Sequence, residues 1–547
     1  MKKTNKLIFL SLALALSANS FAQDFDDFGS FGDLEDESAS SSKLEVNGSA
    51  SMEVRAYVDA DKAKDVELKA NPSGTLSLKY DGNKSDMNLT FSIDADKIKT
   101  HPEDIVDELL LRGYFGNLTL EAGKMKVVWG KGDKLHVLDN FNADDYSDFI
   151  VTDYIDRRIS TPMIRAAYSL PVANINMEAI YAPLLPTDHF ATEGRWAPAQ
   201  LTTLTDGATK LVSMNLLGLE SKAAAANAEA AAETNASAKA AKQQAAIAAD
   251  KAYLEYLTYA NELSSNPQSL FPDLMNLKYS QYGARILGTV GTFDFGASYY
   301  YGWYKQPSVN YSSYIDSIDG MKATIASNPT TLGVAYAGLI SQGKSQSEAL
   351  QSLAVANAWQ FSLPTLDYDR KQTFGLEGAT VLWHFNVRGE FAYNLTDDVD
   401  GTDPWVHNNS IAWLGGFDID LPFWNANLNV QETGTFILHG DECDKNHEQY
   451  AEYSADDVDY EKNGYTNNKI VCNFTTSFLN DKLCPEITAM YGIENGDLVI
   501  LPTLAYKPDQ NLTLTAKGMY IWCKDDDSEF AAWKKNSFVS LSAHYQF

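Results

Sequence analysis

Residues 129–160 bring many ionisable and many apolar side chains together in one stretch. Its acids are Asp133, Asp139, Asp144, Asp145, Asp148, Asp153 and Asp156, and its bases are Lys131, Lys134, Arg157 and Arg158. Apolar residues such as Phe141 and Tyr154 lie among these charges and need a surface to pack against. Acids and bases fixed across a water-filled gap orient and filter polar solutes. We therefore expect this stretch to lie inside a larger structure and to act as a selective element.

The same residues do not suggest catalysis. A nucleophilic mechanism needs a side chain activated by a placed base, and the eight histidines, His136, His384 and His544 among them, form no recognisable cluster in the sequence. The four cysteines match no zinc or redox motif. We therefore expect no enzyme activity, no cofactor and no metal centre.

The overall composition excludes two further classes of protein. The chain has 43 Lys and Arg against 73 Asp and Glu, a net charge of -30, so it repels phosphate backbones and is not expected to bind nucleic acid. After residue 20 there is no run of about 18 or more apolar residues, so a helical membrane protein is not expected either.

The N-terminus has the features of an export signal. Lys2, Lys3 and Lys6 precede an apolar stretch that ends at Leu16, and small residues ending at Ala22 follow it. This order predicts a cleaved secretory signal peptide over residues 1–22. The next residues, 23–42, are acidic and rich in Ser and Gly, which predicts a disordered periplasmic segment.

The C-terminus alternates apolar and polar residues in the manner of a strand. Val539, Leu541, Ala543, Tyr545 and Phe547 fall at every second position, which places them on one face of an extended segment. A terminal Phe with an aromatic residue two positions earlier resembles the closing strand of Gram-negative outer-membrane β-barrels. The resemblance implies that Tyr545 and Phe547 are the signal read by the barrel-assembly machinery.

Similar alternation recurs through residues 43–547 and predicts an all-β, antiparallel up-and-down transmembrane barrel. A soluble sandwich could show the same period, but aromatic residues such as Tyr299, Tyr520 and Trp522 near strand ends favour membrane interfaces. We expect eighteen strands, or sixteen if 485–507 is not a hairpin. The expected ranges are 43–58, 74–81, 85–95, 105–115, 117–128, 161–171, 173–183, 277–290, 292–305, 366–382, 384–396, 407–420, 425–438, 467–479, 485–493, 497–507, 510–522 and 536–547.

Two long connections are expected to carry helices. Residues 206–265 are rich in Ala, with Glu, Lys and Gln between, and residues 311–358 hold two further helical stretches. These insertions could plug the barrel, project as a stalk, or decorate the surface without a role in transport. The cysteines leave one further alternative open, since Cys443 and Cys472 could form a disulfide at the outer rim or remain free thiols.

Charged residues with inward parity are expected to line the lumen opposite residues 129–160, the third outer loop. Arg165 is inward by this pattern, and Lys124 and Lys126 would turn inward if a bulge lies at Gly123, because lysine facing lipid costs roughly 2–4 kcal/mol. The other wall candidates are Glu53, Arg55, Glu178, Arg285, Glu377, Arg388, Glu390 and Lys517. Facing charges would set a transverse field, unless they simply neutralise one another as wall ion pairs.

A second resemblance rests on a motif of about 40 residues. The family pattern is W-G-x-x-D…N-P-x-D…D…R-x-P-x-x-M-x-R-x-x-Y, that of a poorly characterised outer-membrane barrel family. The residues that resemble it are Trp129, Gly130, Asp133, Asp139, Asn142, Asp144, Asp153, Arg157, Pro162, Met163, Arg165 and Tyr168. The chain departs from that pattern at Ala143 and in the spacing before Pro162. The resemblance implies a barrel and a membrane and adds little about substrate.

The sequence thus predicts a porin-like channel in the bacterial outer membrane for passive diffusion of small polar solutes, with a preference for cations. Its expected partners are outer-membrane lipid, the assembly machinery and the solutes themselves. A surface adhesin or recognition barrel with a blocked lumen is the alternative, and oligomeric state stays open.

Overall fold

The computed structural model describes residues 43–59, 65–171, 174–266, 270–450, 455–456, 464–526 and 528–547. The expected signal peptide and the acidic segment that follows it lie outside these residues. Among the residues described, no helix combines the length and apolar character needed to cross a bilayer.

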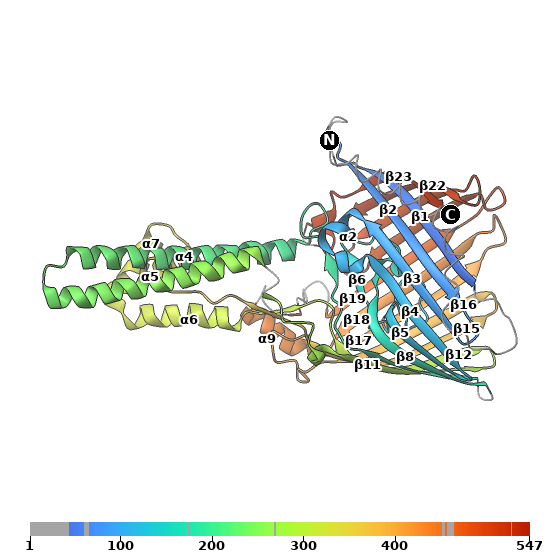
Figure 1. The fold of residues 1–547 in the computed structure, drawn as a ribbon, viewed down its shortest axis with the longest axis horizontal. Helices are drawn as coiled ribbons and strands as arrows, with labels where there is room; N and C mark the ends of the chain where they lie inside the picture. The colour runs from blue at the N-terminus through green and yellow to red at the C-terminus, as the bar shows by residue number, and fades with distance from the viewer. Residues whose placement is uncertain are drawn as a thin grey trace, which may run out of the picture.

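Eighteen antiparallel strands form one sheet that closes on itself, because the first strand pairs with the last (Figure 1). They are β1 (Lys43–Tyr57), β2 (Leu68–Asp81), β3 (Ser85–Asp94), β4 (Val106–Phe115), β5 (Leu118–Met125), β8 (Thr161–Leu170), β9 (Ile175–Ala182), β11 (Gln281–Val290), β12 (Phe293–Trp303), β15 (Arg370–Leu382), β16 (Phe385–Leu395), β17 (Ser410–Asp420), β18 (Asn427–Ile437), β19 (Thr466–Thr475), β20 (Leu483–Gly492), β21 (Leu498–Tyr506), β22 (Leu512–Trp522) and β23 (Phe538–Gln546). Each predicted strand therefore has its counterpart, and the eighteen-stranded barrel is confirmed.

Alternate residues of the strands face opposite sides of the closed sheet. On β15 Leu376 is 59% exposed whereas its neighbour Glu377 is 6% exposed, and on β23 Leu541 is 68% exposed whereas Ser540 is 6% exposed. A water-soluble body would bury the leucines and expose the glutamate. The apolar face is therefore the outer face, and the barrel encloses its polar one.

The hairpin of β20 and β21 decides the strand count. Its two strands are paired from Leu483 to Tyr506 although the connection between them is short, so the sixteen-stranded alternative is wrong. The second strand begins at Leu68, six residues before the predicted start. The reason is that β1 and β2 stay paired as far as Ala56 and Leu68, past the residues that alternate between apolar and polar.

Helices from two connections form a projection that we call the helical stalk (Figure 1). It consists of α4 (Ala199–Ala232), α5 (Ala236–Ser265), α6 (Ser312–Ser327), the π-helical η7 (Pro329–Gly333), α7 (Val334–Ser341) and α8 (Gln346–Asn357). Buried Asn215 of α4 joins the two connections, since its amide donates to the Phe361 carbonyl (2.8 Å) and its oxygen accepts from the Phe361 amide (2.8 Å). The helices expected in both insertions are present, and they project from the barrel instead of filling it.

The remaining short elements lie in the connections. They are α2 (Ala95–Thr100), η3 (Pro102–Asp104), β6 (Ala143–Tyr146), α3 (Tyr154–Arg157), β7 (Arg158–Ile159), β10 (His189–Phe190), η6 (Leu277–Tyr279), β13 (Ser308–Asn310), β14 (Thr365–Asp367), α9 (Gly440–Tyr450) and η9 (Ala531–Trp533). All four cysteines are free thiols, so the bridge considered between Cys443 and Cys472 is not formed.

Candidate constriction site

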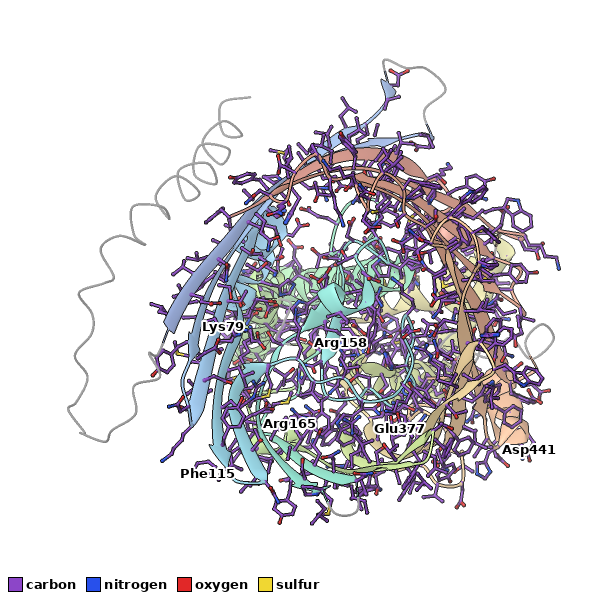
Figure 2. The ribbon with its side chains drawn as sticks, turned by 90° about the vertical axis from the view of Figure 1, so that its right-hand side faces the viewer. Lys79, Phe115, Arg158, Arg165, Glu377 and Asp441 are labelled. Atoms are coloured by element: carbon purple, nitrogen blue, oxygen red, sulfur yellow. The ribbon has the colours of Figure 1, made fainter. Side chains whose placement is uncertain are left out.

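Residues 129–160, the constriction loop, lie within the ring of strands. Figure 2 shows Arg158 near the centre of the ring, with Arg165 and Glu377 closer to the wall. Two short strands of the loop, β6 and β7, pair with each other, and β10 pairs with β6 in parallel. We call β6, β7 and β10 the inner sheet. The constriction loop is thus joined by strand pairing to the connection between β9 and β11.

Apolar residues of the loop pack against one side of the wall. Trp129 and Phe141 are buried edge to face, with ring centroids 5.1 Å apart, and Phe141 meets Tyr300 of β12 at 5.2 Å. Gly283 of β11 makes room for them, because a Cβ there would lie 2.6 Å from Phe141 and 2.7 Å from Trp129. This contact explains why a charged loop also needs large apolar side chains.

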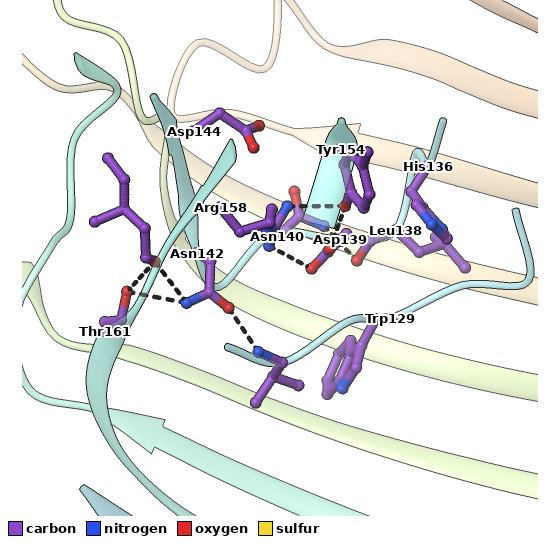
Figure 3. A network of polar contacts seen from close by, with 12 residues as sticks. Trp129, His136, Leu138, Asp139, Asn140, Asn142, Asp144, Tyr154, Arg158 and Thr161 are labelled. Carbon is purple, nitrogen blue, oxygen red and sulfur yellow. Dashed lines mark hydrogen bonds and ion pairs between the residues drawn. The ribbon is translucent and has the colours of Figure 1, made fainter. Parts of the chain in front are cut away.

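Buried Asn142 joins the beginning of the loop to its end (Figure 3). Its side-chain oxygen accepts from the Val127 amide (2.8 Å), and its side-chain nitrogen donates to the carbonyls of Met125 (3.0 Å) and Ile159 (2.9 Å). An alanine here would leave three buried backbone groups without these partners, which costs about 1–3 kcal/mol for each group. Asn142 therefore fixes the angle at which the loop enters and leaves the barrel.

A second lock lies in the middle of the loop (Figure 3). Arg158 Nη2 lies 2.8 Å from Asp139 Oδ1, and both side chains are buried. Arg158 Nη1 also donates to the Tyr154 hydroxyl (2.9 Å), which in turn donates to Asp139. Burial, aided by the nearby Asp139 carboxylate, raises the pKa of Tyr154, so the phenol keeps the proton that it donates. Asp139 and Arg158 thus stabilise the loop and do not act as a free selective charge.

Glu390 of β16 is the wall residue with most bonds to the loop. One carboxylate oxygen accepts from the backbone amides of Lys131 and Gly132, each at 2.7 Å, and the other accepts from Val137 at 2.8 Å. His136 Nδ1 lies 3.0 Å from the same carboxylate. Glu390 thus holds the loop's first turn against the wall.

Other wall charges hold the loop at separate points around the barrel. Arg55 of β1 pairs with Asp148, Arg388 of β16 pairs with Asp133, and Lys517 of β22 donates to the Val151 carbonyl. Glu178 of β9 accepts from the Trp129 indole at 2.6 Å, and Lys371 of β15 donates to Asn140 at 2.8 Å. The loop is therefore fastened to strands on several sides of the barrel and crosses its interior.

The wall also carries a ladder of ion pairs that extends across neighbouring strands. Arg165 of β8 lies 2.7 Å from Glu121 and 2.6 Å from Glu178, and Arg285 of β11 lies 3.5 Å from Glu178 and 3.9 Å from Glu377. On the other side Glu121 pairs with Arg112, and Glu53 pairs with Arg55 on β1. The sequence pattern identified most of these groups, but it missed Glu121 and Arg112 of the short hairpin β4–β5.

The predicted inward bulge at Gly123 is wrong. β5 keeps an unbroken register with β4 and β8 through this residue, and the one register shift nearby lies between Thr90 and Phe91. The lysines instead form ion pairs with acids of the neighbouring connection and strand, Lys124 with Asp104 at 2.9 Å and Lys126 with Asp107 at 3.3 Å. Their charges are thus satisfied without a bulge and without contact with the constriction loop's acids.

The remaining acids of the loop are held more loosely. The pairs are Asp153 with Lys134 at 3.1 Å and Asp144 with Arg157 at 3.9 Å, and Asp145 accepts from the Ser147 amide at 2.9 Å. Asp153 and Asp156, at the beginning of α3 and within it, keep exposed carboxylates. The acids of the loop therefore fall into three groups: Asp133, Asp139 and Asp148 pair with arginines, Asp153 pairs with Lys134 but stays exposed, and Asp156 is exposed.

The C-terminal strand occupies the closing position of the barrel. Phe547 and Gly48 of β1 exchange two backbone hydrogen bonds, at 2.9 and 3.0 Å, and Tyr545 is an exposed outer-face residue. Recognition by the assembly machinery stays a prediction for Tyr545 and Phe547.

Comparison with protein-family models found no match, and comparison with curated proteins found none. Among solved structures, OccK11 (OpdR) of Pseudomonas aeruginosa is 8% identical, with a TM-score of 0.40 over 92% of this chain and 96% of that chain. OccAB3 of Acinetobacter baumannii is 10% identical, with a TM-score of 0.39 over 93% and 100%. A BenF-like porin of Pseudomonas fluorescens is 9% identical, with a TM-score of 0.40 over 92% and 98%.

Proposed function

We propose that this barrel is a bacterial outer-membrane channel for passive diffusion of small polar solutes, with the constriction loop as its narrowest part. The observation that carries the proposal is the division of the sheet's two faces, exemplified by exposed Leu376 beside enclosed Glu377. An apolar outer face requires hydrocarbon around it, and an enclosed charged face requires water or ions inside. The proposed location and the solute class both follow from that division.

The proposed cation preference rests on the charge of the loop. Its seven aspartates exceed its four lysines and arginines by three, so the loop has a net charge of -3 with His136 neutral. Arginines of the wall offset Asp133 and Asp148, whereas Asp153 and Asp156 face solvent. Solvent-facing carboxylates at a narrow point concentrate cations and repel anions.

A surface recognition protein is the second candidate, and the helical stalk is the observation that favours it. The stalk projects from one end of the barrel and is joined to it through the connections β9–β11 and β12–β15 (Figure 1). An elongated helical projection is suited to contact with a partner outside the cell. This function is compatible with a channel only if the constriction loop leaves a conducting path.

Planar-bilayer recording separates the two functions. The refolded chain is added to a bilayer after heat-modifiable gel migration has shown that the barrel is folded. Discrete conductance steps support the channel, and a reversal potential under a salt gradient gives the ion preference. A folded barrel that gives no steps at any applied voltage would favour the recognition protein with a blocked lumen.

A further inference from the structure

Four potential metal ligands meet between the β3–β4 connection and the inner sheet. We call them the rim cluster: His101, Glu103, Asp104 and His189. One ligand atom from each lies within 4.8 Å of the others. His101 precedes η3, whereas His189 belongs to β10, so the cluster forms only when the barrel's outer end is assembled.

The β3–β4 connection holds its three residues in one tight turn. Asp94 caps α2 by accepting from the Lys97 amide at 2.8 Å, and the His101 amide donates to the Lys97 carbonyl at 3.1 Å. Pro102 then begins η3, and the Asp104 amide donates back to the His101 carbonyl at 3.0 Å. Because the backbone of this turn is internally bonded, the imidazole and the two carboxylates stay on the same short segment.

The inner sheet holds the fourth residue. His189 lies opposite Asp145 in the parallel pairing of β10 with β6, and the next residue, Phe190, stacks on Tyr146 with ring centroids 5.5 Å apart. Asp188 accepts from the Asp144 amide at 3.0 Å. The position of His189 is therefore tied to the constriction loop through strand pairing, a ring contact and a hydrogen bond.

The two histidines face each other closely. Their rings are stacked with centroids 3.6 Å apart and planes inclined by 11°. His101 Nδ1 lies 3.2 Å from Glu103 Oε1, and His189 Nδ1 lies 3.5 Å from Asp104 Oδ2. The lone pairs of the imidazole nitrogens lie in the ring planes, so one of the two rings must tilt out of the stack for both to bind the same cation.

Lys124 gives the cluster an outer partner. Its ammonium donates to Asp104 Oδ1 at 2.9 Å and to the Glu103 carbonyl at 2.9 Å. The opposite oxygen of Asp104 is the one that faces His189. Bonds of this kind orient ligating carboxylates in metal sites. Lys124 was predicted to line the lumen, but its observed contacts are with Glu103 and Asp104 of the rim cluster.

We propose that the rim cluster binds a divalent transition-metal ion of the zinc class. Two imidazole nitrogens with two carboxylate oxygens form a ligand set that zinc accepts in tetrahedral geometry. Bonds of about 2.1 Å place tetrahedral ligands about 3.4 Å apart, so the widest pair of the cluster must close by at most about 1.4 Å. Glu103 is exposed, so its side chain can move toward a bound ion.

The bound ion would join the barrel wall to the constriction loop. The three ligands of the β3–β4 connection belong to the wall's outer rim, and His189 belongs to the inner sheet. Figure 1 shows α2, which leads into this connection, beside β6 at the end of the barrel from which the stalk projects. A metal here would fasten the inner sheet to the wall at β10. The wall residues described above, such as Arg55 and Arg388, form their ion pairs with other parts of the loop.

The test is zinc binding by the refolded chain without a histidine tag. After equilibrium dialysis at limiting free zinc, the unaltered protein should retain one ion per barrel. Loss of a residue that only hydrogen-bonds to a metal ligand weakens metal binding roughly 10- to 100-fold. His101→Gln and His189→Gln each remove a ligand itself, so each should weaken zinc binding by at least this factor. His384→Gln is the matched control, since His384 lies in the turn between β15 and β16 at the other end of the barrel.

A spectrum of the unaltered protein makes the result independent of variant folding. Cobalt(II) added in place of zinc should give the intense visible bands of a four-coordinate ion, and zinc should displace them. Equal zinc retention by the unaltered protein and by a folded H101Q/H189Q double variant would overturn the site. So would a cobalt spectrum with only the weak bands of a six-coordinate ion. Neither measurement requires conduction, so this inference stands or fails apart from the proposed channel.

Discussion

Arg55 of β1 and Asp148 of the constriction loop form a two-armed ion pair, with Nη1 2.7 Å from Oδ1 and Nη2 2.8 Å from Oδ2. Arg55 is almost completely enclosed, and its guanidinium also lies 4.3 Å from the centre of the Phe538 ring. A planar guanidinium is suited to a carboxylate in this geometry, and lysine could not replace it. The pair holds the loop at the side of the barrel where the first and last strands meet.

The first prediction concerns the energy of this pair. Arg55→Met leaves Asp148 without its cation, and removal of one partner of a buried pair costs about 3–5 kcal/mol. We expect the lower end of that range, because Asp148 keeps partial access to solvent. The double variant R55M/D148N should cost less than the sum of the two single changes. Urea titration of barrels folded in vesicles measures all three, and additivity within about 0.5 kcal/mol would contradict direct coupling.

The second prediction concerns Glu390, which holds the turn that begins the loop. Glu390→Gln keeps the shape of the side chain but removes the charge and one acceptor arm, and hydrogen bonds to charged groups contribute about 1.5–3 kcal/mol each. We expect the loop's first turn to loosen, so single-channel recordings should show more frequent transitions between conductance levels. Glu377→Gln is the control, because Glu377 lies directly opposite Glu390 on β15 and pairs with Arg285. Equal noise in both variants would contradict the anchoring role.

The barrel could be predicted from sequence because its strands obey a simple rule. Successive residues of a strand face opposite sides of the sheet, so Leu541 faces outward while its two neighbours face inward. The resulting alternation of apolar and polar residues can be recognised in the sequence of one strand alone. The position of β10 could not be predicted in the same way. It has two residues, and its pairing with β6 depends on contacts between distant parts of the chain.

The constriction site was predictable in composition but not in its pairings. The density of acids in the third outer loop indicated that it lies inside, and parity placed Arg55 and Glu390 on the inner face. Parity cannot say which acid each base contacts, so it did not distinguish paired Asp148 from solvent-facing Asp156. It also misassigned Lys124, because the acid that satisfies this lysine comes from a connection with no strand period.

The third prediction concerns the pH dependence of the outer connections. His407 Nδ1 lies 2.5 Å from Asp369 Oδ2, and Tyr304 stacks on the imidazole with ring centroids 4.5 Å apart. Burial by itself lowers the pKa of His407, and so does nearby Lys371. The hydrogen bond to Asp369 and the charges of Asp369 and Asp456 outweigh both, so the pKa is raised.

A raised histidine pKa fixes the sign of the effect. Below the pKa of histidine in the unfolded chain, about 6.5, the protonated imidazole contributes its full stabilisation to the folded connection. That contribution is lost as the pH rises through the higher pKa of His407 in the folded protein. Amide exchange in segments 304–310 and 405–409, corrected for the intrinsic effect of pH, should therefore increase as the pH rises above about 6.5. The variant His407→Gln should show no such step. An opposite trend in the unaltered protein would show that the imidazole is neutral when bound to Asp369.

The last prediction concerns the acids that face solvent at α3. Asp153→Asn and Asp156→Asn together remove two negative charges and release Lys134 from its pair with Asp153, so the ratio of cation to anion permeability should fall. Asp148→Asn leaves Arg55 with Glu53 as its remaining partner, so it should shift the ratio by a similar amount for each charge removed. Asp441→Asn is the control, since Figure 2 shows Asp441 at the outer edge of the molecule, away from the ring's centre. Reversal potentials in a salt gradient give each ratio, and they should be recorded at low ionic strength because salt screens exposed charges. If the α3 double variant and D441N shift the reversal potential equally, the preference arises from the barrel's overall charge and not from the constriction loop.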